Sequence, residues 1–264
     1  LKQGLDLVHP LIHPELPCWV WWNSSLDEAP EMLDALAPTP RRLVVDSSLG
    51  SPRRCLDIIV DRIDAGQAIN DLNWLRLRSW RESLAMVFDP PTRRDALAHV
   101  VQLDIDVEGD HPVKGLLLAA WIADRLGWHL VSSYTVPGNG SGVNGIGAEF
   151  ERSDGQTVQF RLMPVPVGMP KTHPGALVGV RLICQRSVGS SPGAPLCVIL
   201  CSESGGCMRL ESGGMASMEL AEEVVPLPNE SEEMELARLL GGGHDSTNPL
   251  LAAAAPIAAK LLPS

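Results

Sequence analysis

The amino-acid sequence predicts an α/β domain over residues 1–91, followed by an α+β domain with a mainly antiparallel sheet over residues 92–264. In the first part, short continuous apolar runs alternate with amphipathic helical patterns, as expected of parallel strands covered on both faces. After Pro91 apolar and polar residues alternate and hairpin signals appear, which is typical of antiparallel sheets. A chain of 264 residues can form two modest cores.

The first domain begins with a predicted strand at Val20–Trp22 and a short helix at Asp27–Leu36. A second strand, Leu43–Val45, is apolar throughout. Ser51 and Pro52 are residue types favoured at the N-cap and first position of a helix, so a longer helix is expected to begin there. The apolar side chains that recur at helical spacing within it are Leu56, Ile59, Val60 and Ile63.

A segment rich in tryptophan and arginine, Asn70–Asp89, ends this domain. Ser79 is the predicted N-cap of its helix, with Glu82 completing a capping box, and Pro90 stops the helix. One interpretation is a core helix with solvated arginines. The other is a docking surface, because Trp and Arg are enriched at interface hot spots. The candidate contact residues are Trp74, Arg76, Arg78, Trp80 and Arg81.

The second domain begins with an alternating strand, His99–Val107, and an apolar helix from Pro112 to Gly127. Asp154–Gly155 is a strong hairpin signal. An acidic helix ending near Leu240 and an alanine-rich helix, Leu250–Leu262, complete the chain. The other predicted strands are Leu130–Val131, Glu149–Ser153, Thr157–Leu162, Val178–Gln185, Leu196–Glu203, Cys207–Glu211 and Val224–Val225.

Composition excludes some classes of partner. The net charge of −11 argues against nucleic acid or an anionic membrane as the main partner, because both select basic surfaces. The longest apolar run is interrupted by Pro256 and Lys260 and is too short to cross a bilayer. Six cysteines without a CxxC pair suit a reducing cytoplasm. The chain opens at Leu1 without a signal peptide, and a preceding segment is expected.

Asp46, Ser47 and Ser48 follow a buried strand, where open α/β sheets bind ligands. They are candidates for a sugar-phosphate or nucleotide site, although the same residues commonly cap turns. The run Gly140–Gly145 matches GxGxxG by letter but leads into a strand, so a loop is expected rather than a dinucleotide site. The scattered histidines predict no metal site, and no cofactor is expected.

Two cysteines, Cys201 and Cys207, lie on predicted strands joined by a short glycine-containing loop. A hairpin centred on Ser204 places them directly opposite, at about 4.5 Å between Cα atoms, within the reach of a disulfide. A two-residue turn at Gly205–Gly206 instead places Cys207 opposite Ser204. Cys197 lies on the same face as Cys201 and is a possible third thiol. All three could equally be small buried core residues.

Four stretches resemble the OpcA family of glucose-6-phosphate dehydrogenase assembly proteins. The family segment D-L-x-W-x-R-L-x-x-W-R-x-x-L-A matches Asp71–Ala85. Leu16–Trp22 is similar to the family's LPxxLWW strand, and Leu43–Ser48 to its DSS strand end. Leu118–Trp128 is similar to its GWLASRLGW helix. The four stretches occur in the family's order.

The resemblance implies a non-enzymatic, cytoplasmic activator that binds the glucose-6-phosphate dehydrogenase oligomer of the oxidative pentose phosphate pathway. In cyanobacterial members it further implies control by thioredoxin, with Cys201–Cys207 as the redox disulfide. One alternative is an enzyme or small-ligand binder that uses the end of the α/β strand. Another is a purely structural subunit with inert thiols.

Overall fold

The computed structural model describes residues 18–38, 41–138, 142–166, 175–184, 196–203, 207–213, 221–226, 232–241 and 247–263. Within these ranges, side chains are not described at 92–93, over 196–226 and at several positions of 232–241. In the described part, no helix is both long and apolar enough to span a bilayer.

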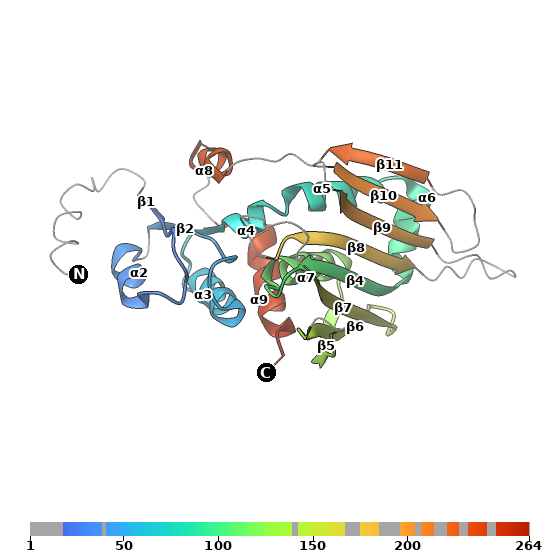
Figure 1. Ribbon diagram of the computed structural model, residues 1–264, viewed down its shortest axis with the longest axis horizontal. Coiled ribbons are helices and arrows are strands. Elements are labelled where there is room, and N and C mark those ends of the chain that lie inside the picture. Colours follow the sequence, from blue (N-terminus) through green and yellow to red (C-terminus); the bar gives the residue numbers. More distant parts are fainter. Residues whose placement is uncertain are drawn as a thin grey trace, which may run out of the picture.

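The first part of the chain forms a three-stranded parallel sheet in the order β1-β2-β3, as its apolar runs predict (Figure 1). Its strands are β1 (Trp19–Trp21), β2 (Arg42–Val45) and β3 (Ile69–Asp71). Helices α2 (Pro30–Leu36) and α3 (Pro52–Asp64) connect them. β1 begins one residue earlier than the prediction and is only partly covered, because it lies at an edge of the sheet.

The second sheet has eight strands in the order β11-β10-β9-β8-β4-β7-β6-β5. They are β4 (Val100–Glu108), β5 (His129–Val136), β6 (Gly145–Glu151), β7 (Thr157–Val165), β8 (Leu177–Cys184), β9 (Leu196–Glu203), β10 (Cys207–Gly213) and β11 (Ala221–Pro226). Neighbouring strands are antiparallel except β4 and β7, which pair in parallel. The sheet is therefore mixed, although antiparallel pairs dominate.

The parallel pair arises because the chain leaves β4, passes through α7 (Val113–Leu126), and returns by way of β5 and β6. β7 then lies beside β4 and runs in the same direction. A parallel pair needs a long crossover, here a helix and two strands. Alternation along β4 and β7 predicts that each is a strand but contains no signal for this pairing.

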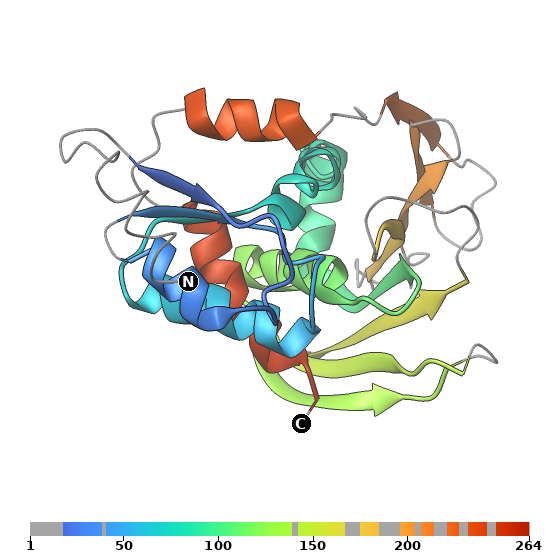
Figure 2. The same cartoon turned by 60° about the vertical axis from the view of Figure 1, so that its left-hand side comes forward.

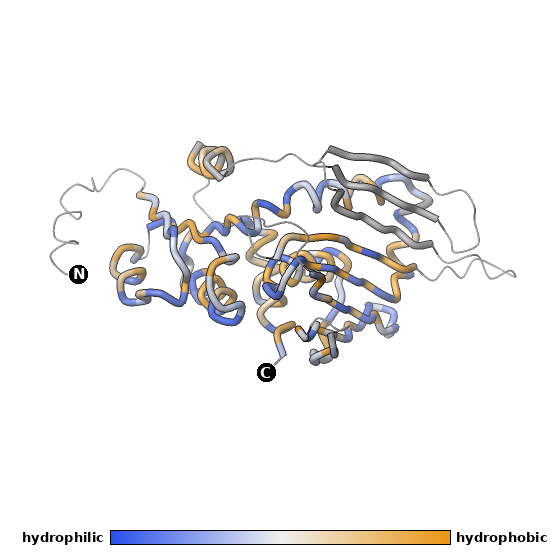
Figure 3. The backbone as a smooth tube through the Cα atoms, viewed as in Figure 1, coloured by the Kyte–Doolittle hydropathy of each residue, from blue (hydrophilic) through white to orange (hydrophobic). Residues whose placement is uncertain are grey.

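Helices pack on one face of the larger sheet (Figure 2). α7 lies against this face, and α9 (Pro249–Leu261) packs on α7, α3 and β5. α9 is thus an apolar layer between the two sheets, where Figure 3 shows hydrophobic residues gathered. Buried residues of both parts belong to one continuous hydrophobic core. That residues 1–91 form a domain of their own stays a prediction.

Short helices link the two sheets. They are α4 (Leu72–Leu75), α5 (Arg78–Val87), α6 (Pro91–Arg94) and a 3-10 helix, η2 (Asp95–His99). The acidic helix α8 (Glu232–Gly241) packs against α4, and its Leu239 forms a small second core with Val44 and Leu72.

Candidate functional site

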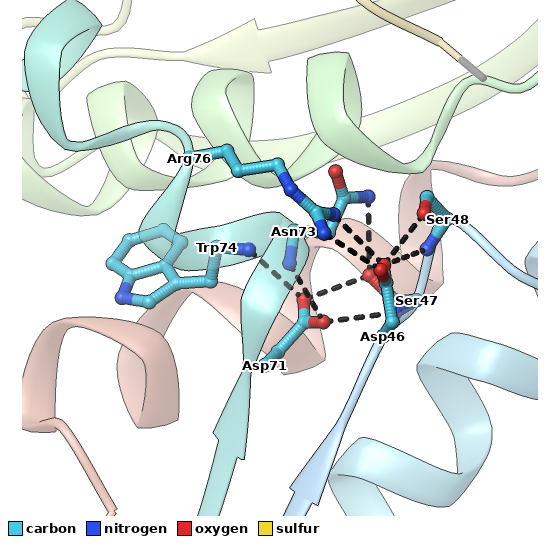
Figure 4. Close-up of polar contacts among 7 residues, drawn as sticks. All are labelled: Asp46, Ser47, Ser48, Asp71, Asn73, Trp74 and Arg76. Carbon is cyan, nitrogen blue, oxygen red and sulfur yellow. Dashed lines mark hydrogen bonds and ion pairs between the residues drawn. The ribbon is translucent and has the colours of Figure 1, made fainter. Parts of the chain in front are cut away.

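The ends of β2 and β3 carry a buried polar cluster at the position where a ligand site was predicted (Figure 4). Asp46, Ser47 and Ser48 directly follow β2, and Asp71 is the last residue of β3. The carboxyl ends of parallel strands meet at one edge of a sheet. This geometry brings Asp46 close to Asp71, and Ser47, which is 24 positions before Asp71 in the sequence, bonds to the Asp71 carboxylate.

Asp71 fixes the start of α4 and ties it to β2. Its carboxylate, fully buried, accepts hydrogen bonds from Ser47 N (2.9 Å) and Ser47 Oγ (2.7 Å). It also accepts from Asn73 N and Trp74 N, each at 3.2 Å, and so acts as the N-cap of α4. Burial, and then the charge of Asp46, raise the pKa of Asp71 to about 6.

Asp46 forms a buried ion pair with Arg76. Arg76 Nη1 and Nη2 donate to the two carboxylate oxygens at 3.0 and 2.8 Å, a bidentate geometry. Ser48 donates to Asp46 from its backbone N (2.9 Å) and its Oγ (2.6 Å). Burial alone raises the pKa of Asp46, but the hydrogen bonds and charge of Arg76, aided by Ser48, outweigh burial and lower it.

These contacts give the cluster a structural role. Both carboxylates and Ser47 and Ser48 bond to one another or to neighbouring backbone groups, so neither carboxylate is held ready as a general base. Among the residues with a described position, no three His, Cys, Asp or Glu side chains are arranged to hold a metal ion. The cluster fastens two strand ends to the two ends of α4, through Asp71 at its N-cap and Arg76 at its C-cap.

The structure divides the five predicted contact residues into two groups. Trp74 and Trp80 are 1% and 5% exposed and lie in the core, and Arg76 is paired with Asp46. Arg78 is exposed and pairs with Glu82 at 2.8 Å, and the guanidinium of Arg81 stacks 3.9 Å from the centre of the Trp74 ring. Of these five residues Arg78 is exposed, whereas Arg76 and Arg81 are half-buried.

The predicted capping box at Ser79 is wrong. α5 begins at Arg78, and its N-cap is Leu77, which makes no side-chain cap. Arg76 and Leu77 have helical backbone angles, so α4 runs almost directly into α5, and Arg81 N already donates to Leu77 O. Glu82 pairs with Arg78 instead.

The hairpin of β9 and β10 has a register that differs from both predicted registers. Cys207 pairs with Glu203, and Cys201 pairs with Arg209. Cys201 and Cys207 therefore share a face but are diagonal neighbours, whose Cα atoms are typically about 7–8 Å apart. A disulfide needs about 4.4–6.8 Å. Their side chains, and that of Cys197, lie outside the described part, so the disulfide stays a prediction.

The other cysteines lie outside this hairpin. Cys18 is partly exposed, whereas Cys55 and Cys184 are buried. Burial, with the nearby charges of Asp71, Asp27 and Asp46, raises the pKa of Cys55 to about 12. Since the thiolate is the reactive form, Cys55 is chemically inert.

Residues 67–255 match the family described as the C-terminal domain of a glucose-6-phosphate dehydrogenase subunit, OpcA, and residues 1–60 match its N-terminal domain. The chain belongs to the OpcA family. Proteins named OpcA and described as OxPP cycle proteins are similar to it. That of Synechococcus elongatus is 40% identical over 231 residues, covering 87% of this chain and 50% of the relative. That of Nostoc punctiforme is 33% identical over 240 residues, covering 90% and 50%.

This OpcA-family chain thus spans about half the length of the curated relatives it matches. Its fold is similar to those of a ketoreductase and a dehydrogenase of known structure. The 3-ketoreductase KijD10 of Actinomadura kijaniata, solved with NADP, has a TM-score of 0.54 at 11% identity, covering 97% of this chain and 82% of KijD10. UDP-N-acetylglucosamine 3-dehydrogenase of Acidithiobacillus ferrooxidans has a TM-score of 0.51 at 10% identity, covering 97% and 80%. These likenesses concern the fold alone.

Two contacts of this OpcA-family chain escaped sequence reasoning. Asp71 precedes Asn73 and Trp74 at the spacing of an N-cap, a signal that could have identified it as the cap of α4. The stacking of Arg81 on Trp74 follows only from α4 and α5 being nearly continuous.

Proposed function

We propose that this chain is part of a non-enzymatic, cytoplasmic protein that binds glucose-6-phosphate dehydrogenase and favours its active or assembled state. The observation that carries the proposal is membership of a family described as a subunit of that dehydrogenase. The internal bonding of Asp46, Ser47 and Asp71 supports a non-catalytic role, because the polar groups at the usual ligand edge are engaged with one another.

Activation by binding is a difference between two affinities. The activator must bind the active dehydrogenase more tightly than the inactive one, and a tenfold shift needs about 1.4 kcal/mol of difference. No chemical step by this chain is required.

We further propose that Cys201 and Cys207 form a disulfide that thioredoxin reduces. In this exchange the two thiols of reduced thioredoxin would be oxidised to a disulfide within thioredoxin. The Cys201–Cys207 disulfide would be reduced to two thiols. Placing Cys201 opposite Cys207 shifts the register by two residues from the Cys201–Arg209 pairing. Because two is an even number, every side chain keeps its face. In the shifted register the loop between the last paired residues of β9 and β10 would be longer. A shift of two residues would also move β10, together with β11, along β9 by about 7 Å.

The test is dehydrogenase activity at fixed glucose 6-phosphate, with and without the full-length protein, first oxidised and then reduced by thioredoxin. We expect activation that fades on reduction, and expect the double variant Cys201→Ser/Cys207→Ser to lose this redox response. Cys18→Ser is the matched control, because Cys18 is a partly exposed cysteine outside the hairpin. If the protein activates the dehydrogenase equally well when oxidised and when reduced, it is a constitutive partner with inert thiols.

The alternative, a sugar-phosphate or nucleotide site at Asp46–Ser48, has one observation in its favour. Asn73 Oδ1 is buried beside the cluster and has no hydrogen-bond partner among the described residues. Two results together would favour this alternative over the activator. The protein would have no effect on the dehydrogenase, and it would bind glucose 6-phosphate or NADP saturably, with binding abolished by Asn73→Ala.

A further inference from the structure

Arg81 is held in one place by the core beneath it. Its guanidinium lies 3.9 Å from the centre of the Trp74 ring, and Trp74 is only 1% exposed. Trp74 in turn lies on α4, whose first turn is fixed by Asp71. A cation stacked on a buried indole gains the attraction of the ring and loses freedom of movement. Arg81 is therefore positioned in advance.

Within the described part of the chain, Arg81 has no acidic partner of the kind that comparable arginines have. Among the residues whose positions are described, no carboxylate lies within ion-pair distance of Arg81, and its buried Nε has no hydrogen-bond partner. Arg76, by contrast, binds Asp46 at 2.8 Å, and Arg161 binds Asp104 at 3.1 Å. A guanidinium carries five donors, and a desolvated donor without an acceptor costs stability.

Burial lowers the pKa of Arg81 to about 10, with the charge of Arg78 acting in the same direction and that of Glu82 opposing it. The group nevertheless remains a cation at neutral pH. It is a partly buried positive charge in a chain whose net charge is −11.

The surface beside Arg81 suits contact with a protein. Arg81 is half-buried and lies at the border between the buried face of α5 and its outward side. Helical spacing places exposed Ala85 next to it, together with Arg78 and Glu82, which pair with one another. Met86, one residue further on, is 57% exposed. Because five residues turn a helix by about 140°, Met86 projects away from Arg81. The patch beside the anchored arginine therefore consists of Ala85 and the paired charges of Arg78 and Glu82, with Arg81 as its candidate hot-spot residue.

We propose that Arg81 is the anchor for a carboxylate side chain of the glucose-6-phosphate dehydrogenase subunit, which docks on the outward side of α5. The inference rests on the proposed function. Charge complementarity selects the partner's acidic group, because an Asp or Glu can accept two parallel hydrogen bonds from the guanidinium, as Asp46 does from Arg76. The apolar neighbours of that carboxylate would cover Ala85, which lies one helical turn from Arg81.

The experiment measures the Kd of the full-length protein for the dehydrogenase by biolayer interferometry, for wild type, Arg81→Gln, Arg81→Lys and Arg125→Gln. Arg125→Gln is the control, because it removes the same charge from an exposed arginine on α7 that pairs with Asp124. We expect Arg81→Gln to weaken binding by about tenfold or more and the control to stay within about twofold. Arg81→Lys should recover only part of the loss, since lysine keeps the charge without the planar fork.

Thermal unfolding separates this role from a structural one. Arg81→Gln should keep the melting temperature of the wild type within a few degrees, because no ion pair with a described residue is lost. A wild-type affinity in Arg81→Gln would overturn the inference and leave the proposed function intact. Failure of the wild type to bind the dehydrogenase would overturn both. If inorganic phosphate raises the melting temperature of the wild type but not of Arg81→Gln, then Arg81 binds a small anion. That result would also overturn the inference.

Discussion

At the scale of single residues, the pair of buried carboxylates is the costliest feature of the site. Asp46 and Asp71 lie at adjacent strand ends, and only Asp46 has a guanidinium partner in the described structure. Asp71 is stabilised by N–H and O–H donors alone, so its ionised form bears the cost of burial. The pKa of Asp46 is therefore lowered and the pKa of Asp71 is raised from the usual value, although the two side chains are identical.

Asp71 should make the stability of the protein depend on pH. Its folded pKa of about 6 lies above the ordinary 3.8, so the folded state binds the proton more tightly than the unfolded state. This contribution is complete below about pH 4 and is lost as pH rises through 6, amounting to roughly 3 kcal/mol. Urea unfolding between pH 4 and 8 measures it.

The variant Asp71→Asn tests this assignment. It should remove the slope between pH 4 and 6 and lower the stability at neutral pH by about 1–3 kcal/mol, because an amide cannot accept from all four donors. An unchanged slope would assign the titration to another group, and half-buried Asp106, whose pKa is also raised by burial, would be examined next.

At the scale of elements, the start of α3 depends on a residue from another segment. Asp27 accepts hydrogen bonds from the backbone N and the Oγ of Ser51, the N-cap of α3. The turn before it contains Gly50 at φ 115°, and a Cβ there would lie 3.0 Å from Asp27 Oδ2. The hydrogen bonds from Ser51 hold the pKa of Asp27 below its usual range.

Asp27→Ala should therefore destabilise the protein by about 1 kcal/mol, the usual net contribution of a hydrogen bond to stability. Asp61→Ala, which removes an exposed carboxylate from the body of α3, is the control and should change stability by less than about 0.5 kcal/mol. Chemical denaturation of the three proteins measures the difference, and equal effects of the two substitutions would contradict the role of the Asp27–Ser51 hydrogen bonds.

The elements also show what the sequence can and cannot predict. Ser51–Pro52 and Asp154–Gly155 act locally, and the helix and the hairpin they predict are present. The pairing of β4 with β7 and the contact of Asp27 with Ser51 join distant segments, which local patterns do not encode. The capping box predicted at Ser79 is absent because the backbone is already helical there. The N–H of Arg81, which a cap at Ser79 would serve, donates to Leu77 O. The Asp46 cluster was located from its strand end, but its partners Asp71 and Arg76 were not.

At the scale of the whole molecule, α9 packs between the parts of the chain that carry the two sheets. It contacts α3 on one side and α7 on the other, and its Leu251 is fully buried in the common core. Separate domains would each keep their own core, whereas a shared helix couples their unfolding.

Leu251→Ala should consequently destabilise both sheets together, by about 2–4 kcal/mol. Hydrogen–deuterium exchange should show equal loss of protection for amides of β2 and β4 under conditions of global opening. Loss of protection confined to one of these strands would instead favour two independent domains divided near Pro91.

The position of α9 along the chain has a consequence for synthesis on the ribosome. α3 is translated early, yet part of its apolar surface is covered by a helix that begins only at Pro249. Until that helix leaves the exit tunnel, the nascent first sheet exposes surface that can associate with other chains. The packing of α3 is then expected to be completed only once α9 has left the tunnel, with chaperones shielding α3 in the interval.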